Sequence, residues 1–551
     1  MKRLERRAII LGLDGATFKV LLPRAQRGEM PELAALLKDG TWGSLRSTIP
    51  PFSAQAWVSL ATGKNQARHG IVDFWERSPD HSRRRFVTAR GVQGETLWQT
   101  ISRHGLRAGV VNVPVTYPPS PVNGYLVSGL LTPQGKDDFM YPESLREEIL
   151  AQVPDYNPDP FDPVGASRRQ ILELEAWMEK HERVSRYLME RYPAELSFSV
   201  VQALDHLQHL FWDDIVRGEG GGRYAALTGR CYRLADEIVG HRRQMMDGRT
   251  TLFLVSDHGF GSVSKWFHVN RFLVEQGLLK LGEAQGGGAS SSLIRLGLTP
   301  QRMRGLVRRL DVLGLRRWMG RLARVTLGRQ IDRALTPPID WSQTQALSGS
   351  PATEGVFVNL RGREPQGIVE PGEPYEALRE KLIAELCRLR DPDTGVPVVR
   401  AAHRREELYE GPFLDLLPDV VFDLGDGPYL ASDAPVATRI LEPLPGGYLQ
   451  GRHQPDGIFV AAGPDIRKGA QIEGARIVDV APTVLYALGL PIPEDMDGRP
   501  LLEIFEQDYR TAQPVQYAEP ELLQDVTSGP VYDEEDTLEM ERRLRGLGYV
   551  S

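Results

Sequence analysis

The sequence predicts an α/β fold in which a mostly parallel central sheet carries helices on both faces and an inserted cap region interrupts the core. Three observations support this prediction. Short apolar runs recur along the 551-residue chain, longer amphipathic stretches separate them, and the alternation weakens in the middle of the chain. Continuous apolar strands that alternate with helices are typical of parallel sheets buried on both faces. Such sheets gather ligands beyond the carboxyl ends of their strands.

Six short apolar runs are predicted to form strands. They lie at residues 8–13, 109–113, 196–201, 251–255, 420–422 and 458–461. Apolar residues at helical spacing predict helices between and after these strands. The predicted helices lie at residues 172–192, 224–246 and 373–389, and in the stretch IVDVAPTVLYALGL at 477–490.

The weaker alternation from 267 to 424 divides the chain into a core and an insertion. Residues 286–292 read GGGASSS, which is a linker by composition. The predicted units, in chain order, are the first part of the core (1–262), an insertion or cap (263–440), the second part of the core (441–505) and a tail (506–551). The tail ends in a predicted short helix over 534–550, which is acidic at its start and basic toward its end, as the helix dipole favours.

Composition excludes several classes of protein. With 41% hydrophobic and 25% charged residues the chain resembles an ordinary globular protein, and its formal net charge of −7 argues against a nucleic-acid binder. The two cysteines, Cys231 and Cys387, cannot build a disulfide framework or a thiolate zinc site. The apolar run at 8–13 is too short for a signal peptide, and no stretch reaches the length of a membrane span. We therefore expect a soluble cytoplasmic protein.

Residues 293–333, inside the predicted cap, form a basic segment with eleven arginines against two acids. Its apolar residues fall near helical spacing, which favours a solvated helical hairpin of the cap. Two other interpretations stay open. The segment could make a peripheral contact with anionic lipid headgroups, or its arginines could lie over a site that takes anionic substrates.

Acidic and imidazole side chains follow the predicted strands of the core. Asp257 and His258 follow the apolar run 252–255 with only Ser256 between, and burying either of them unpaired would cost several kcal/mol. Asp14 follows the first strand in the same way, although a lone aspartate there is more often a helix cap. Asp257 and His258 are therefore the stronger sign of a functional site.

Four further residues complete a set that could bind metal ions. Asp205 and His209 are four residues apart and would share one face of a helix, Ser53 begins a predicted helix, and His453 lies just before a strand. Carboxylates, imidazoles and a hydroxyl, without thiolates, could hold two divalent ions. Nitrogen and oxygen ligands of this kind suit zinc better than magnesium or calcium, and Mn²⁺ could fill the same positions.

The order of these motifs resembles the alkaline phosphatase superfamily and, within it, the type I phosphodiesterase/nucleotide pyrophosphatase branch. The resemblance rests on GLDG, PPFSAQAWVSLATGKNQARHGI, DHLQH, SDHGFG, GRHQPDGIF and the closing DVAPTVLYALGLPIPEDMDGRPL. It implies an alkaline-phosphatase-like core and metal-dependent hydrolysis of phosphate esters through a phosphoserine at Ser53. As ligand sets it implies Asp205, His209 and His453 for one ion, and Asp14, Asp257, His258 and Ser53 for the other.

Two departures from the family pattern bear on the substrate. The family has threonine where Ser53 stands, and a serine can perform the same attack. It has an asparagine that donates to the phosphoryl oxygen where this chain has Phe74, which cannot donate. The donor must then come from elsewhere, and Lys64, Arg84 and a cap arginine are the candidates. Neither the sulfatase nucleophile motif nor the serine motif of the cofactor-independent phosphoglycerate mutases is visible.

The expected substrate is an anionic phosphate-containing small molecule or a lipid head group. A phosphodiesterase or nucleotide pyrophosphatase is the leading hypothesis. A phosphomonoesterase and a transferase of phosphoryl head groups share every residue named above and stay open. A membrane-surface binding protein built on a phosphatase scaffold is a hypothesis of another class, and the complete ligand set disfavours it. The sequence does not predict an oligomeric state.

Overall fold

The computed structural model describes residues 6–76, 85–163, 165–218, 221–282, 337–445, 449–520 and 531–549. Arg84 and the basic segment 293–333 lie outside the described residues. The expectations about both therefore stay predictions. In the part of the chain that the structure describes, no helix has the length and apolar character to cross a membrane.

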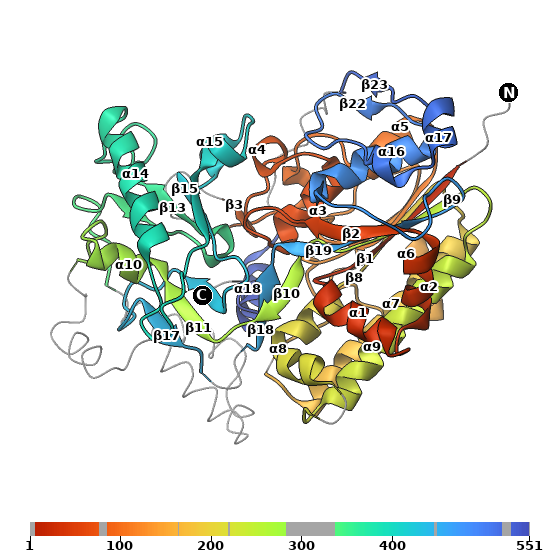
Figure 1. Ribbon diagram of the computed structural model, residues 1–551, viewed down its shortest axis with the longest axis horizontal. Coiled ribbons are helices and arrows are strands. Elements are labelled where there is room, and N and C mark those ends of the chain that lie inside the picture. Colours follow the sequence, from red (N-terminus) through yellow and green to blue (C-terminus); the bar gives the residue numbers. More distant parts are fainter. Residues whose placement is uncertain are drawn as a thin grey trace.

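A ten-stranded sheet forms the centre of the molecule (Figure 1). In spatial order its strands are β20 (Ala470–Gln471), β2 (Thr41–Arg46), β19 (Asp456–Ala462), β9 (Thr250–Val255), β1 (Arg7–Leu13), β8 (Leu196–Val201), β5 (Ala108–Val113), β6 (Gly124–Ser128) and β7 (Met140–Tyr141), with β21 (Ala475–Arg476) also paired to β2. Strand β1 is parallel to β8 and β9, and β5 is parallel to β6 and β8, whereas β19 runs antiparallel to both of its neighbours. The prediction of a mostly parallel central sheet is confirmed.

Helices cover both faces of this sheet (Figure 1). One face packs against α3 (Ser53–Thr62), α5 (Leu97–Arg103) and α16 (Val480–Leu488), and the other against α1 (Phe18–Gln26), α2 (Pro31–Asp39), α7 (Arg168–Arg191), α8 (Ala203–Arg217) and α9 (Ala225–Gln244). Neighbouring strand residues alternate between the two cores: Ile10 belongs to the first and Leu11 to the second. Both are fully buried, which is why the run in β1 is apolar at every position.

A second lobe lies beside the sheet and is built mostly from the middle of the chain (Figure 1). It contains the sheets β16 (Tyr429–Ser432)–β11 (Lys265–His268)–β17 (Leu441–Pro443) and β12 (Ala346–Leu347)–β13 (Gly355–Val358)–β15 (Val420–Asp423)–β14 (Ala401–Arg404), together with α10 (Val269–Glu275) and α14 (Glu373–Arg388). Its own hydrophobic core includes Phe267, Leu382 and Phe422. The run 420–422 is a strand, as expected, but it belongs to this lobe and not to the central sheet.

A hairpin and a tail complete the parts of the fold that matter for the site. Strands β10 (Gly259–Ser262) and β18 (Gly451–Gln454) pair antiparallel, with Phe260 opposite His453. The tail contains α17 (Gln507–Ala512) and α18 (Glu534–Gly546), and α18 lies between the two lobes (Figure 1). Further short elements are α4 (Gln66–His69), α6 (Leu145–Gln152), α15 (Arg405–Leu408), β3 (Trp75–Glu76), β4 (Arg85–Phe86), β22 (Ile492–Pro493) and β23 (Tyr517–Ala518).

Candidate metal centre

Five elements bring the seven predicted site residues together. Strands β1 and β9 are parallel neighbours that end at the same edge of the sheet, and each is followed by site residues. Helices α3 and α8 begin beside this edge, and β18 of the hairpin passes over it. The residues and their elements are Asp14 after β1, Ser53 at the start of α3, Asp205 and His209 on α8, Asp257 and His258 after β9, and His453 in β18. All seven side chains are buried.

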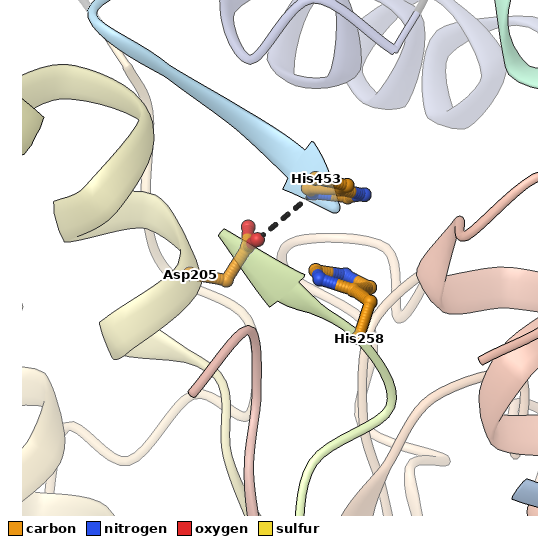
Figure 2. Close-up of side chains that lie close together, drawn as sticks. All are labelled: Asp205, His258 and His453. Carbon is orange, nitrogen blue, oxygen red and sulfur yellow. Dashed lines mark hydrogen bonds and ion pairs between the residues drawn. The ribbon is translucent and has the colours of Figure 1, made fainter. Parts of the chain in front are cut away.

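One group of ligand atoms comes from Asp205, His209 and His453. The Oδ1 atom of Asp205 lies 3.0 Å from His453 Nε2 and 3.5 Å from His209 Nε2. The two Nε2 atoms lie 3.0 Å apart. Figure 2 shows the contact between Asp205 and His453. Donors bound to one tetrahedral zinc lie roughly 3.3 Å from one another, so this spacing suits a shared ion.

A second group surrounds His258 Nε2. This atom lies 3.1 Å from Asp257 Oδ2, 3.7 Å from Asp14 Oδ1 and 3.1 Å from Ser53 Oγ. Among the residues that the structure describes, Asp14 Oδ1 and Asp257 Oδ2 are buried atoms without a hydrogen-bond partner. Buried carboxylate oxygens of this kind are costly unless a cation compensates their charge.

The remaining oxygen of each carboxylate is fixed by the protein. Asp14 Oδ2 accepts a hydrogen bond of 3.0 Å from the indole N–H of Trp57, which lies on α3. Asp257 Oδ1 accepts one of 3.1 Å from the backbone N–H of Gly15. Each carboxylate is therefore oriented by one oxygen and presents the other to the centre.

All three histidines use Nδ1 to donate to a backbone carbonyl. The acceptors are Gly451 for His209 at 3.1 Å, Pro51 for His453 at 2.9 Å and Gly259 for His258 at 3.1 Å. Because a carbonyl oxygen only accepts, the proton of each neutral ring is on Nδ1 and a lone pair is on Nε2. The lone pairs of His209 and His453 then face each other across 3.0 Å, and a cation between them would relieve their repulsion.

The pKa values in this site are shifted in both directions. Against the lowering effect of burial, the carboxylate of Asp257 raises the pKa of His258. Burial raises the pKa of Asp14 well above its usual value, and the carboxylates of Asp257 and Asp205 add to the rise. Burial lowers the pKa of His209 to about 3 and holds that of His453 well below its usual value. Neutral imidazoles such as those of His209 and His453 are the form that binds metal, and a nearby cation would favour the ionised form of Asp14.

His258 lies between the two groups. Its ring stacks on that of His453, with centroids 3.5 Å apart and planes inclined by 23° (Figure 2). Donor atoms of Asp205, His258 and His453 approach one another closely, as do those of Asp14, Asp257 and His258. These are two buried His/Asp clusters consistent with a bimetallic site, and the division of the histidines between two ions stays a prediction.

Comparison with known proteins decides the family. The family model for type I phosphodiesterase / nucleotide pyrophosphatase matches residues 8–312, more than half of the chain. The chain belongs to this family. It is therefore a hydrolase of the phosphodiesterase/pyrophosphatase family with buried His/Asp clusters as metal-site candidates. His453 lies beyond the matched residues, and the fold brings it to the others.

Other similarities are more remote. The 2,3-bisphosphoglycerate-independent phosphoglycerate mutase of Cereibacter sphaeroides is 31% identical over 86 residues, which span 15% of this chain and 16% of that enzyme. Phosphonoacetate hydrolase from Sinorhizobium meliloti 1021, solved with phosphonoformate, has a TM-score of 0.49 and 15% identity, with 88% of this chain and 95% of that chain covered. Murine ectonucleotide pyrophosphatase/phosphodiesterase 5, an inactive variant solved with AMP, has a TM-score of 0.45 and 14% identity, with 88% and 96% covered.

The expected substrate-binding residues of this phosphodiesterase-family protein lie in different places. Lys64 follows the far end of α3, roughly 16 Å along the helix from Ser53, and its ammonium pairs with Asp495. The structure therefore does not bring Lys64 to the ligand groups. Phe74 is fully buried near the centre and packs against Tyr549, with ring centroids 4.9 Å apart.

Sequence reasoning missed Tyr549, the residue of the tail that reaches the centre. Its hydroxyl donates to Asp205 Oδ2 at 2.8 Å, and burial raises its pKa well above the usual value, with the carboxylates of Asp205 and Asp14 adding to the effect. The local sequence LGYV near the end of the chain has no pattern that predicts a contact between Tyr549 and Asp205. The contact exists because α18 packs back onto the core.

Proposed function

We propose that the protein is a phosphodiesterase that cleaves phosphate esters through a phosphoserine formed on Ser53. The observation that carries this proposal is the position of Ser53 Oγ, which lies 3.1 Å from His258 Nε2, beside two buried ligand clusters. Ser53 is also the first residue of α3, whose first intrahelical hydrogen bond runs from Ala56 N to Phe52 O. The amides before Ala56 thus lie in the positive turn of the helix, which favours an anion.

Two divalent ions fit the donor set, and zinc suits its nitrogen and oxygen atoms best. Asp205, His209 and His453 would hold one ion, and Asp14, Asp257, His258 and Ser53 the other. When bound, such ions supply positive charge that favours the serine alkoxide and stabilises the charge on the phosphoryl and leaving oxygens. Mn²⁺ could occupy the same ligands.

The proposed reaction has two steps, formation of the phosphoserine and its hydrolysis. Ser53 loses its proton to water and its Oγ attacks phosphorus; the new P–Oγ bond forms as the bond to the ester oxygen breaks, and the departing alcohol takes up a proton. Water then attacks the phosphoserine, the P–Oγ bond breaks, and Ser53 regains its proton. The buried carboxylates and imidazoles keep the reacting atoms in place and exclude other water.

A phosphomonoesterase and a transferase of phosphoryl head groups would use the same residues. They differ from the diesterase in whether the substrate carries a second ester, and in whether water or an alcohol attacks the phosphoserine. We propose an anionic phosphate-containing small molecule or lipid head group as the substrate.

The first experiment compares cleavage of bis-p-nitrophenyl phosphate and p-nitrophenyl phosphate by protein purified without chelator, with metal content measured by elemental analysis. We expect close to two zinc ions per chain and faster cleavage of the diester. Faster cleavage of the monoester would move the protein to the phosphatases. Absence of bound metal, and of activity after Zn²⁺ or Mn²⁺ is restored, would contradict the proposal.

Ser53→Ala tests the nucleophile, because it removes the attacking oxygen and almost no packing. We expect kcat to fall at least about a thousandfold while fold and metal content stay nearly unchanged. Ser59→Ala is the matched control: Ser59 lies on the same helix and its hydroxyl also meets a histidine, His69 Nε2, at 2.8 Å. This control should keep its activity. Wild-type rates in Ser53→Ala would show that the phosphoserine mechanism is wrong.

A further inference from the structure

The hydroxyl of Tyr549 lies among the ligand atoms of the candidate centre. It is 2.8 Å from Asp205 Oδ2, 3.1 Å from His453 Nε2 and 3.3 Å from His209 Nε2. The tyrosine side chain is only 2% exposed. The tail of the chain therefore supplies a hydroxyl that lies beside three of the candidate ligand atoms.

The end of α18 directs Tyr549 to this position. Gly548 adopts a left-handed φ of 82°, and the backbone N–H of Tyr549 donates to Leu544 O at 3.0 Å while that of Gly548 donates to Arg545 O at 3.3 Å. These two bonds form the Schellman motif, which ends a helix and turns the chain sharply. After this turn the Tyr549 ring packs near Phe52 and His453, with centroid distances of 6.2 Å and 5.3 Å.

The tail that carries Tyr549 is part of the core. Met540, Leu544 and Leu547 are buried in one hydrophobic cluster with Phe52, the residue before Ser53. Burial on this scale stabilises each side chain by about 1.5–3 kcal/mol. A tail that only blocked the site would have to detach before substrate could enter. It would therefore need weaker contacts with the core than α18 makes.

Polar contacts hold α18 against a different part of the core. Arg543 is 5% exposed and forms an ion pair of 3.1 Å with Asp159. Lys136 pairs with Asp536 at 3.0 Å near the start of the helix. The buried pair of Arg543 and Asp159 and the more exposed pair of Lys136 and Asp536 would both be lost if the tail detached. Tyr549 is therefore held beside the ligand atoms by the packing of the whole tail.

We propose, on the basis of the proposed function, that the Tyr549 hydroxyl is a catalytic group that donates a hydrogen bond to a phosphoryl oxygen of the substrate. Phe74 cannot donate, yet its ring supports that of Tyr549 at a centroid distance of 4.9 Å and so places a donor over the centre. In the structure the hydroxyl proton goes to Asp205 Oδ2. The same hydroxyl also makes a hydrogen bond with the Ser53 side chain. A phosphoryl oxygen beside Ser53 would therefore be a second charged acceptor for the rotating O–H.

Tyr549→Phe is the test, because it removes the hydroxyl and keeps the ring that packs on Phe74. Isothermal titration of the zinc-loaded variant with inorganic phosphate should give a Kd about ten- to a hundredfold higher than that of wild type. The value of kcat/KM for bis-p-nitrophenyl phosphate should fall by a similar factor. Metal content and melting temperature should stay near those of wild type.

Tyr532→Phe is the matched control on the same tail. The Tyr532 hydroxyl donates to the carbonyl of Leu131 at 3.0 Å, in contact with the core and not with the ligand atoms. Loss of this hydroxyl should affect stability slightly and leave phosphate binding and kcat/KM at wild-type values.

The outcomes separate this inference from the proposed function. If wild type cleaves the diester and Tyr549→Phe matches it in both assays, the donor role is wrong and the proposed function stands. If Tyr549→Phe binds phosphate more tightly or turns over faster, the tyrosine obstructs the site and the donor role is also wrong. If wild type cleaves no ester, the proposed function fails. Weaker phosphate binding by Tyr549→Phe than by wild type would then still support the donor contact. Equal or undetectable phosphate binding by both proteins would overturn the donor contact as well.

Discussion

At single residues, burial has different consequences inside the candidate metal centre and beside it. Asp14 and Asp257 each present a buried oxygen that a cation can compensate. Glu354, which is 4% exposed, faces Arg452, but the Arg452 Nη1 atom lies 3.9 Å from its Oε1, beyond hydrogen-bond distance. Arg452 donates instead to backbone carbonyls. Burial raises the pKa of Glu354 to about 7, and the negative charge of Asp423, which also faces Glu354, adds to this rise.

This pKa predicts a stability that falls as pH rises. The folded carboxyl keeps its proton up to about pH 7, whereas the unfolded one releases it near 4.5. The folded state therefore binds more protons between these values, and the free energy of unfolding falls across this window by up to about 3 kcal/mol, then levels off. Glu354→Gln removes the titrating group, so urea unfolding at pH 5 and pH 8 should show a smaller loss in the variant. An equal loss in both proteins would refute the assignment.

At the scale of elements, the contact between β1 and α3 sets the geometry of the centre. Gly12 of β1 has no side chain, and Trp57 of α3 fills the space above it: a Cβ at this position would lie 2.4 Å from the Trp57 ring. The same indole orients Asp14 through its N–H. The strand and the helix that carries Ser53 are therefore fixed to each other by one close approach.

Gly12→Ala should disturb stability and activity together. The methyl group would push against a fully buried indole that has little room to move, and overpacking of this kind costs about 1–3 kcal/mol. Displacement of Trp57 would also release Asp14 and shift Ser53, so kcat/KM should fall. Gly248→Ala is the control, because a Cβ there would meet nothing within 4 Å. Urea unfolding and diester cleavage of both variants test this; equal behaviour would contradict the prediction.

The elements that sequence could predict are those whose pattern is local. Strands β1, β8, β9 and β19 are rich in apolar residues because both of their faces are covered, although Ser197 and Ser199 interrupt β8. Helices α7 and α9 lie within a few residues of the predicted ranges. Strands β2 (TWGSLR) and β6 (GYLVS) were not predicted: polar and glycine residues interrupt β2, and the apolar run of β6 is only three residues long. Their place in the sheet depends on neighbours that are distant in sequence.

The same distinction holds for the candidate centre. Asp257 and His258 could be predicted because they follow a buried strand, and Asp205 and His209 because their spacing places them on one helix face. Lys64 could not be placed, since spacing alone does not show that α3 carries it away from Ser53. Tyr549 has no local signature: its contact depends on the packing of α18 against the core.

At the scale of the whole molecule, the centre joins segments from nearly the full length of the chain. Its residues run from Asp14 to Tyr549, and they come from the sheet, two helices, the β10–β18 hairpin and the tail. Carboxylates and lone pairs that repel one another without a cation are gathered where all of these elements meet. Metal binding should therefore stabilise the complete fold and not one loop.

Removal of metal should lower the melting temperature of the entire protein in a single transition. Ions bound only by the folded state add about 2.7 kcal/mol per site when their free concentration is one hundred times Kd, and chelation removes this contribution while leaving Asp14 and Asp257 uncompensated. Differential scanning calorimetry measures the effect before chelation, after chelation and after Zn²⁺ or Mn²⁺ is returned. The ion that restores more stability is the better fit to the ligands. Asp257→Asn, which weakens one ligand set, should start from a lower melting temperature and lose less on chelation. Elemental analysis must first show that chelation has removed the metal from wild type. If the melting temperature is then unchanged, the clusters are stable without an ion.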